Sequence, residues 1–506
     1  MATEVRETER KYEVESGAVL PSLLDVPHVV QETELAQHKL SAEYYDTDDL
    51  RLIRAGVTLR RRRGGSDAGW HLKLPISGDS RREIQLPLGR AGRRVPAELA
   101  ALVRAYARGA ALGPVAHIGT TRRGRMLLDA EGASLAEVVT DDVTAESLGE
   151  STTLSQWREV EVELTGGDLA LLQAVDKRLR RAGLRPAGHA AKLARALAGR
   201  LPPPADDVPL TERTPAGDVV LAYVRAQLTA LQSLDPMVRR DAPDAVHQMR
   251  VATRRLRSAL KTYREILDQP ASGGLRAELA WLGGVLGEAR DVEVMAGLLH
   301  GRVAEVPVEL VLGPVQARVT AHFTPRAASA RGAVIEALDS ARFVALLNSL
   351  TDLVSTPLTS AAAGQPAAGV LPATVGGAYR RLRKRARRAQ QAPTGLPADE
   401  ALHETRKAAK DVRYAAEAAE PAVGKDAHRL AKQAKQVQSV LGDQHDAVVA
   451  RDTVREIGIR AHLAGENAFT FGLLHERCDH DAKVLAGQAG DVWAQAFLPR
   501  YARWLR

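Results

Sequence analysis

The spacing of apolar residues along the chain changes near residue 200. Before that point, short segments alternate apolar and polar residues, which is the pattern of strands with one covered face. We expect strands at residues 6–14, 38–45, 57–63, 70–75, 81–88, 117–128 and 157–164, and helices at residues 96–110 and 168–182. After that point, apolar residues recur at the 3.6-residue spacing of amphipathic helices. The pattern predicts an α+β protein in which a β-rich domain precedes an all-α domain.

Two stretches interrupt the periodic pattern. Residues 200–217, RLPPPADDVPLTERTPAG, are rich in proline and acidic residues and have no period of their own, which is typical of an interdomain linker. A chain of 506 residues is also too long for one hydrophobic core. We therefore expect domains at residues 1–200 and 217–506, joined by a linker at 201–216. Residues 355–374 are rich in Ala, Gly, Pro, Ser and Thr, and we expect a mobile loop there.

The helical part of the chain repeats itself. Residues 246–264 match residues 402–420 at an offset of 156, and LGEARD at 286–291 matches LGDQHD at 441–446 at an offset of 155. Tyr223 and Tyr379 are also separated by 156 positions. Three matches at nearly one offset indicate a tandem duplication, with repeats at about 217–354 and 373–506.

Charged residues gather on single faces of the predicted strands. Glu7, Glu9 and Lys11 alternate along the first strand, so their side chains point to one side. The last strand places three acidic residues on one face and Val160, Val162 and Leu164 on the other. An apolar outer face requires a covering helix, so the charged face is the interior of a closed sheet. In such an interior, Arg and Lys hold phosphate oxygens, and carboxylates hold hard divalent cations that bridge those oxygens.

The order of these charged strands resembles the CYTH, or triphosphate tunnel metalloenzyme, family over about the first 200 residues. The resemblance rests on Glu7-x-Glu9-x-Lys11, Leu59–Arg62, Trp70–Lys73, Arg82-Glu83, Asp141, Glu159–Glu163 and Lys192. It implies an eight-stranded antiparallel β-tunnel that binds triphosphates with Mg²⁺ or Mn²⁺. The metal ligands that it implies are drawn from Glu7, Glu9, Asp141, Glu159, Glu161 and Glu163. The catalytic set that it implies joins Glu7 and Glu9 to the phosphate-binding residues Lys11, Arg60, Arg62, Lys73, Arg122 and Lys192. Family members often have Ser before the last lysine, where this chain has Ala191.

Each helical repeat carries a row of basic residues. His247, Arg250, Arg254, Arg257 and Lys261 fall within an arc of about 80° on a helix of 3.6 residues per turn. The second copy places His403, Arg406, Lys410 and Arg413 on one face in the same way. Aligned cations repel each other, so two such faces indicate an anionic ligand that neutralises them.

The spacing H-x-x-R-x-x-x-[RK]-x-x-R in both copies resembles the CHAD domain, from about residue 209 to the C-terminus. The resemblance implies a duplicated four-helix-bundle domain with a basic cleft that binds inorganic polyphosphate. Further cations that we assign to this ligand are Arg290, Arg380, Arg383, Arg387, Lys407, Lys432, Lys435 and His445.

Together the two resemblances imply hydrolysis of inorganic triphosphate or short polyphosphate, with longer polyphosphate held by the helical domain. One alternative is an adenylate cyclase or organic triphosphatase on the same tunnel, which the aromatic content of 4% does not favour. A second alternative is a non-catalytic polyphosphate receptor or granule-targeting protein, which the intact acidic set does not favour. A third is a nucleic-acid binder, suggested by the net charge of +8. We do not expect nucleic acid, because no aromatic residues interleave with the basic helices.

The remaining features of the chain concern its location. A single cysteine, Cys478, excludes an internal disulfide and fits a reducing compartment. The N-terminus is charged and lacks the apolar core of a signal peptide, and no apolar run is long enough to cross a bilayer. We therefore expect a cytoplasmic protein without membrane contacts, with polyphosphate granules as one place of association.

Overall fold

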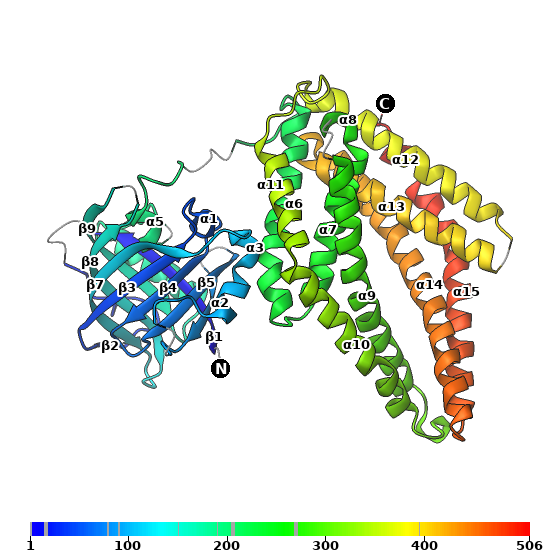
Figure 1. Cartoon of the computed structure of the whole chain (residues 1–506), viewed down its shortest axis with the longest axis horizontal. Helices are drawn as coiled ribbons and strands as arrows, with labels where there is room; N and C mark the ends of the chain where they lie inside the picture. Colours follow the sequence, from blue (N-terminus) through cyan, green and yellow to red (C-terminus); the bar gives the residue numbers. More distant parts are fainter. Residues whose placement is uncertain are drawn as a thin grey trace. The chain divides into compact units, whose positions relative to one another are not determined.

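The computed structural model describes residues 3–14, 19–77, 80–89, 92–149, 151–189, 191–203, 208–267, 272–393 and 395–505. The chain divides into two compact units, residues 1–206 and 207–506 (Figure 1). The predicted linker at 201–216 spans this division, and its residues 204–207 lie outside the described ranges.

The first unit is a closed antiparallel barrel. Its strands are β1 (Thr3–Glu13), β3 (His38–Asp46), β4 (Thr58–Arg63), β5 (Gly69–Ser77), β6 (Ser80–Leu86), β7 (Gly113–Leu128), β8 (Ser134–Ser147) and β9 (Thr153–Leu164). They follow the order β1-β6-β5-β4-β3-β7-β8-β9, and pairing of β9 with β1 closes the ring. The short strands β2 (Gln31–Glu34) and β10 (Arg185–Pro186) pair with β7 and β1. The expected eight-stranded antiparallel tunnel is confirmed.

Two groups of helices cover the outside of this barrel. Apolar residues of α4 (Leu169–Arg181) pack on β1, β8 and β9, where Val160 and Val162 are buried beneath the helix. The helices α2 (Ala97–Leu102) and α3 (Arg104–Ala107) pack on the strands around Trp70. The expected helix at 96–110 is therefore two helices, joined at Val103. Because the outer face is apolar and covered, the charged side chains face the interior.

One strand of the ring, β8, was absent from the alternation pattern. Its first half buries Ala136 and Val138 under α4, whereas its second half buries Val143 and Ala145 on the opposite face. There they pack with Leu193 and Leu197, which lie in and directly after α5 (Lys192–Ala196). The apolar residues of β8 thus change faces midway, so the two-residue period that marks a strand is lost. A further short helix, α1 (Arg51–Arg54), begins after Leu50.

The second unit is entirely helical. Its helices are α6 (Ala216–Arg239), α7 (Ala245–Thr262), α8 (Arg264–Leu267), α9 (Ser272–Ala304), α10 (Val315–Asp339), α11 (Ala341–Ser355), α12 (Ala367–Gln391), α13 (Leu396–Val423), α14 (Lys425–Leu463) and α15 (Phe469–Ala496), with 3-10 turns at Val308–Leu310 and Pro499–Tyr501 (Figure 1). The sequence offset pairs α6 with α12, α7 with α13, and α9 with α14. The first copy also contains α11. Residues of α9, α10, α14 and α15 share one hydrophobic core.

The expectation of a loop through residue 374 is wrong in its second half. The helix α12 begins at Ala367, and Ala367, Leu371 and Val375 are buried at helical spacing. Alanine is the best helix former, so an Ala-rich segment becomes helical once it has a core to pack against. Within the described residues, no helix is both long enough and apolar enough to span a membrane.

We predict that a fragment of residues 1–206 folds alone. The three hydrophobic clusters of the barrel unit draw their residues from positions 12–201, so this fragment keeps all of them. Circular dichroism should report β structure that melts cooperatively. A control fragment ending at residue 190 lacks Leu193 and Leu197 and should melt earlier, since each buried leucine stabilises by about 1.5–3 kcal/mol. Non-cooperative melting of the 1–206 fragment would contradict the predicted domain boundary.

Candidate functional site

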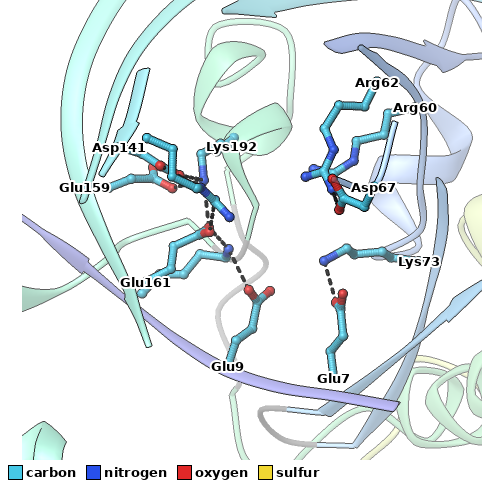
Figure 2. A network of polar contacts seen from close by, with 12 residues as sticks. Glu7, Glu9, Arg60, Arg62, Asp67, Lys73, Asp141, Glu159, Glu161 and Lys192 are labelled. Carbon is cyan, nitrogen blue, oxygen red and sulfur yellow. Dashed lines mark hydrogen bonds and ion pairs between the residues drawn. The ribbon is translucent and has the colours of Figure 1, made fainter. Parts of the chain in front are cut away.

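The interior of the barrel contains a cavity of about 240 Å³ lined mainly by charged side chains. Residues from β1, β4, β5, β6, β7, β9 and α5 contribute to it: Glu7, Glu9, Lys11, Arg60, Arg62, Lys73, Glu83, Arg122, Glu161, Glu163 and Lys192. Figure 2 shows two groups of these side chains facing each other across the interior. Residues far apart in the sequence therefore meet because alternate positions of each strand point inward.

Three carboxylates form a compact group on one wall, which we call the acidic trio. Asp141 lies on β8 directly opposite Glu159 on β9, and Glu161 follows two residues later on the same face. One carboxylate oxygen from each residue lies within 4.8 Å of the other two, and all three residues are buried. Carboxylate oxygens are the ligands that Mg²⁺ and Mn²⁺ prefer. The donor set and its spacing fit a divalent metal ion.

Three cations contact the acidic trio. The Nζ atom of Lys192 lies 2.8 Å from Asp141 Oδ2, 2.8 Å from Glu159 Oε1 and 2.7 Å from Glu161 Oε1 (Figure 2). Arg122 donates to Asp141 at 2.7 Å and to Glu161 at 2.8 Å, and Lys11 also donates to Glu161. Burial alone would raise the pKa of Glu161, but Lys11, Lys192 and Arg122 hold it well below its usual range. Glu161 is therefore ionised, and the three cations lie where they compensate the charge of the trio.

The other predicted metal ligands lie outside this trio. Glu9 accepts a hydrogen bond from Lys11 at 3.0 Å, and Glu7 contacts Lys73 (Figure 2). Burial, together with the neighbouring Glu83, raises the pKa of Glu7 to about 8. Glu163 lines the cavity and lies opposite Glu9 in the sheet.

The opposite wall carries the cations Arg60, Arg62 and Lys73 (Figure 2). Arg62 contacts Asp67, and Arg60 Nη2 and Lys73 Nζ lie 3.8 and 4.0 Å from Glu83 Oε1. Burial, together with the charges of the nearby Arg60 and Arg122, lowers the pKa of Arg62 to about 9. The environment of Arg62 therefore disfavours its charged form. An anionic ligand bound beside it would offset the repulsion between these cations.

The sequence pattern did not single out three further residues of the cavity. Tyr44 and Glu137 line the cavity from β3 and β8, and Asp67 lies in the loop between β4 and β5. Glu137 shares a strand face with Asp141, so its inward direction could have been predicted if β8 had been recognised as a strand. Asp67 lies in a loop, where side chains do not alternate regularly, so the sequence could not show that it lines the cavity.

In the helical unit, α7 and α13 bring the two basic rows together. Burial, together with the charges of Arg254, Arg406 and Arg250, lowers the pKa of Lys410 to about 6. We call Arg250, Arg254, Arg406 and Lys410 the basic cluster. A tyrosine links the same two helices, since Tyr263 on the turn after α7 donates to the carbonyl of Ala415 at 2.6 Å.

The basic cluster is not fully satisfied by the protein. The buried Nε atoms of Arg250 and Arg406 have no hydrogen-bond partner among the described residues. Both guanidinium groups lie over a glycine of the repeated LG motif. A Cβ at Gly287 would lie 3.6 Å from Arg250 Nε, and one at Gly442 would lie 3.3 Å from Arg406 Nη2. The duplication therefore preserves both the arginine and the space beside it.

The other predicted polyphosphate ligands are distributed more widely. Lys261, Arg413, Arg290 and Lys407 form ion pairs with Asp411, Glu417, Glu293 and Glu404, respectively. The buried Nδ1 atoms of His247 and His403 lack a partner among the described residues, and His445 lies against His403 with ring centroids 4.8 Å apart. Arg257, Lys432, Lys435 and Arg380 are exposed on α7, α14 and α12. Arg383 and Arg387 line a different groove, beside Trp493 and Phe497.

Comparisons with known proteins agree with this two-part architecture. A family model described as the CYTH domain matches residues 5–193, and one described as the CHAD domain matches residues 222–455. Two uncharacterised proteins from Mycobacterium tuberculosis, of strains CDC 1551 and H37Rv, are each 40% identical over 487 residues. These alignments cover 93% of this chain and 92% of each relative.

Two solved structures resemble the chain more distantly. PptA from Streptomyces chartreusis is 23% identical with a TM-score of 0.45, over 56% of this chain and 100% of that one. The CHAD domain from the plant Ricinus communis is 25% identical with a TM-score of 0.42, over 58% of this chain and 94% of that one. The family models and the two close relatives decide the assignment: this chain belongs to the family in which a CYTH domain is followed by a CHAD domain.

Proposed function

We propose that the barrel hydrolyses inorganic triphosphate or short polyphosphate with Mg²⁺ or Mn²⁺, and that the helical unit binds longer polyphosphate. Members of the CYTH family are triphosphatases and cyclases. The observation that carries the proposal is the barrel interior, where the acidic trio lies across from Arg60, Arg62 and Lys73 (Figure 2). Between them is a cavity of about 240 Å³ lined by Glu161 of the trio and by these three cations. Such a cavity offers a place for a metal ion and, opposite it, donors for phosphate oxygens.

In this proposal, Asp141, Glu159 and Glu161 hold the metal, which neutralises charge on the phosphate chain when bound. Arg60, Arg62 and Lys73 bind phosphate oxygens from the other wall and stabilise the charge of the leaving phosphate. Glu7 and Glu9 hold Lys73 and Lys11 in place through the contacts described above.

A tunnel carboxylate then takes the proton of the attacking water. Glu163 suits this role, because it lines the cavity and burial raises its pKa above that of an ordinary glutamate. The cavity also favours an inorganic chain over a nucleotide. Tyr44 is the one aromatic residue among those that line its described part, so stacking surface for a base is scarce.

For the helical unit, the basic cluster supports binding of a long polyanion. Its unpartnered Nε donors and its mutual repulsion are both relieved by phosphate oxygens. A polymer held there would be present at raised local concentration for the tunnel of the same chain.

We predict that Glu161→Gln weakens Mn²⁺ binding at least about tenfold, because loss of even an indirect partner of a metal site costs about 10–100-fold. Tripolyphosphate turnover at limiting Mn²⁺ should fall with it. The matched control is Glu163→Gln, two residues along the same strand face but outside the acidic trio. Its Mn²⁺ affinity, measured by isothermal titration, should stay within about twofold of the wild-type value. Equal losses of Mn²⁺ affinity in the two variants would contradict the metal assignment.

We predict that Arg254→Ala combined with Lys410→Ala weakens binding of long polyphosphate and leaves tripolyphosphate turnover nearly unchanged. Removing two cations should flatten the plot of log affinity against log salt by about one to two units. Fluorescence anisotropy with labelled polyphosphate measures this slope. Arg455→Ala with Arg460→Ala removes two exposed charges on α14 that are not among the predicted polyphosphate ligands, and this variant serves as the control. If the control flattens the slope as much, the α7–α13 cluster is not the binding site.

We predict that polyphosphate binding tightens as pH falls from about 8 to 6. The pKa of Lys410 is about 6 in the free protein, and a bound polyanion raises it, so binding takes up a proton. The affinity should therefore rise by up to about tenfold per pH unit in this range. Lys410→Arg keeps its charge throughout and should show a flatter profile at constant ionic strength. An unchanged pH profile in this variant would exclude Lys410 as the group that takes up the proton.

A further inference from the structure

The acidic trio already holds a cation that belongs to the protein. The Nζ atom of Lys192 lies within 2.8 Å of one oxygen from each of the three carboxylates. The ammonium group donates a hydrogen bond to Glu161 at 2.7 Å and lies within ion-pair distance of Asp141 and Glu159. This is the arrangement that a metal ion bound by the same carboxylates would require, so Nζ and the ion compete for one place.

The charge count leads to the same conclusion. The three carboxylates already face three cations, Lys192, Arg122 and Lys11, the last of which is shared with Glu9. Adding a divalent ion without removing a cation would add two positive charges to a buried site that is already compensated, which is costly. One of the three cations must leave when the metal binds.

Lys192 is the cation best placed to leave. Arg122 is held by two parallel hydrogen bonds to Asp141, at 2.9 and 2.7 Å, and Lys11 is shared with Glu9 on strand β1. Lys192 instead begins the five-residue helix α5, on a flexible four-carbon side chain. It also lines the same cavity as Arg60, Arg62 and Lys73 of the opposite wall. Its ammonium group can therefore turn from the trio toward the phosphate wall.

We propose that Lys192 is the internal counter-ion of the acidic trio, that a divalent metal displaces it, and that the displaced ammonium group then binds the phosphate chain. The inference rests on the proposed function and assigns Lys192 a second position in it. Metal and triphosphate must then bind cooperatively, because the phosphate chain gives the displaced ammonium group a new partner. The metal alone binds weakly, since it has to separate Lys192 from three carboxylates.

The test is a titration of the full-length protein with Mn²⁺, alone and with a non-hydrolysable imidotriphosphate. In the wild type, the analogue should tighten Mn²⁺ binding. Lys192→Met keeps the length of the side chain and removes its charge. This variant should bind Mn²⁺ alone at least tenfold more tightly than the wild type, a change of about 1.4 kcal/mol, and the analogue should add little. Mn²⁺ binding to Lys192→Met that is equal to or weaker than wild type overturns the proposal.

Two further measurements complete the test. Lys73→Met removes a cation from the opposite wall, so its affinity for Mn²⁺ alone should match that of the wild type. Lys192→Met without metal should melt below the wild type, because three carboxylates lose a partner, and saturating Mn²⁺ should restore its melting temperature. A variant that stays unfolded in saturating Mn²⁺ contradicts the exchange of one cation for the other.

The outcomes separate this proposal from the proposed function. Tighter Mn²⁺ binding by Lys192→Met in a protein that hydrolyses no phosphate chain supports the displacement and contradicts the hydrolase. If the wild type hydrolyses tripolyphosphate and Lys192→Met binds Mn²⁺ no more tightly than the wild type, only the displacement is contradicted.

Discussion

Charge balance inside the closed barrel is the constraint on which the rest of this unit depends. The outer face of the sheet is apolar and lies under α2, α3 and α4, and many of the charged side chains on the inner face are buried. Glutamates and lysines on the inner face must therefore satisfy one another. They do so by dividing between two walls, with the acidic trio and its three cations on one side and Arg60, Arg62 and Lys73 on the other (Figure 2).

In the described part of the helical unit, by contrast, cations lie together without enough acidic partners to compensate them. Its basic cluster crowds four cations between α7 and α13, with a lysine whose pKa falls to about 6 and two buried Nε atoms without partners among the described residues. On the tunnel wall, exchange of Lys192 for a divalent ion adds only one positive charge, whereas the basic cluster is stabilised by any phosphate oxygen that reaches it. This difference explains why we assign a metal-dependent reaction to the first unit and metal-independent binding to the second.

The fold and the faces of its strands followed from the sequence, but the distances between them did not. Alternation along β1 and β9 indicated that Glu7, Glu9, Glu159, Glu161 and Glu163 share the interior. It could not show that β1 pairs with β9 so that Lys11 lies opposite Glu161 and Glu9 opposite Glu163. That register depends on long-range pairing around the ring, and it determines which carboxylates converge and which are occupied by lysines.

Two elements escaped prediction for a related reason. In β8, the apolar residues change faces because α4 covers one end and α5 the other, so the helices packed on the strand, and not the strand itself, set its pattern. The start of α12 has a loop-like composition and becomes helical through burial of Ala367, Leu371 and Val375. In both places, tertiary packing overrides the local signal.

The most direct test of the account is a phosphate-release assay on the full-length protein with tripolyphosphate, long-chain polyphosphate and ATP, each with Mg²⁺, with Mn²⁺ and with a chelator. The account predicts that tripolyphosphate is hydrolysed in the presence of metal, faster than ATP, and that the chelator abolishes release. Release from no substrate, a preference for ATP, or release that persists in the chelator would contradict a metal-dependent inorganic triphosphatase in the barrel.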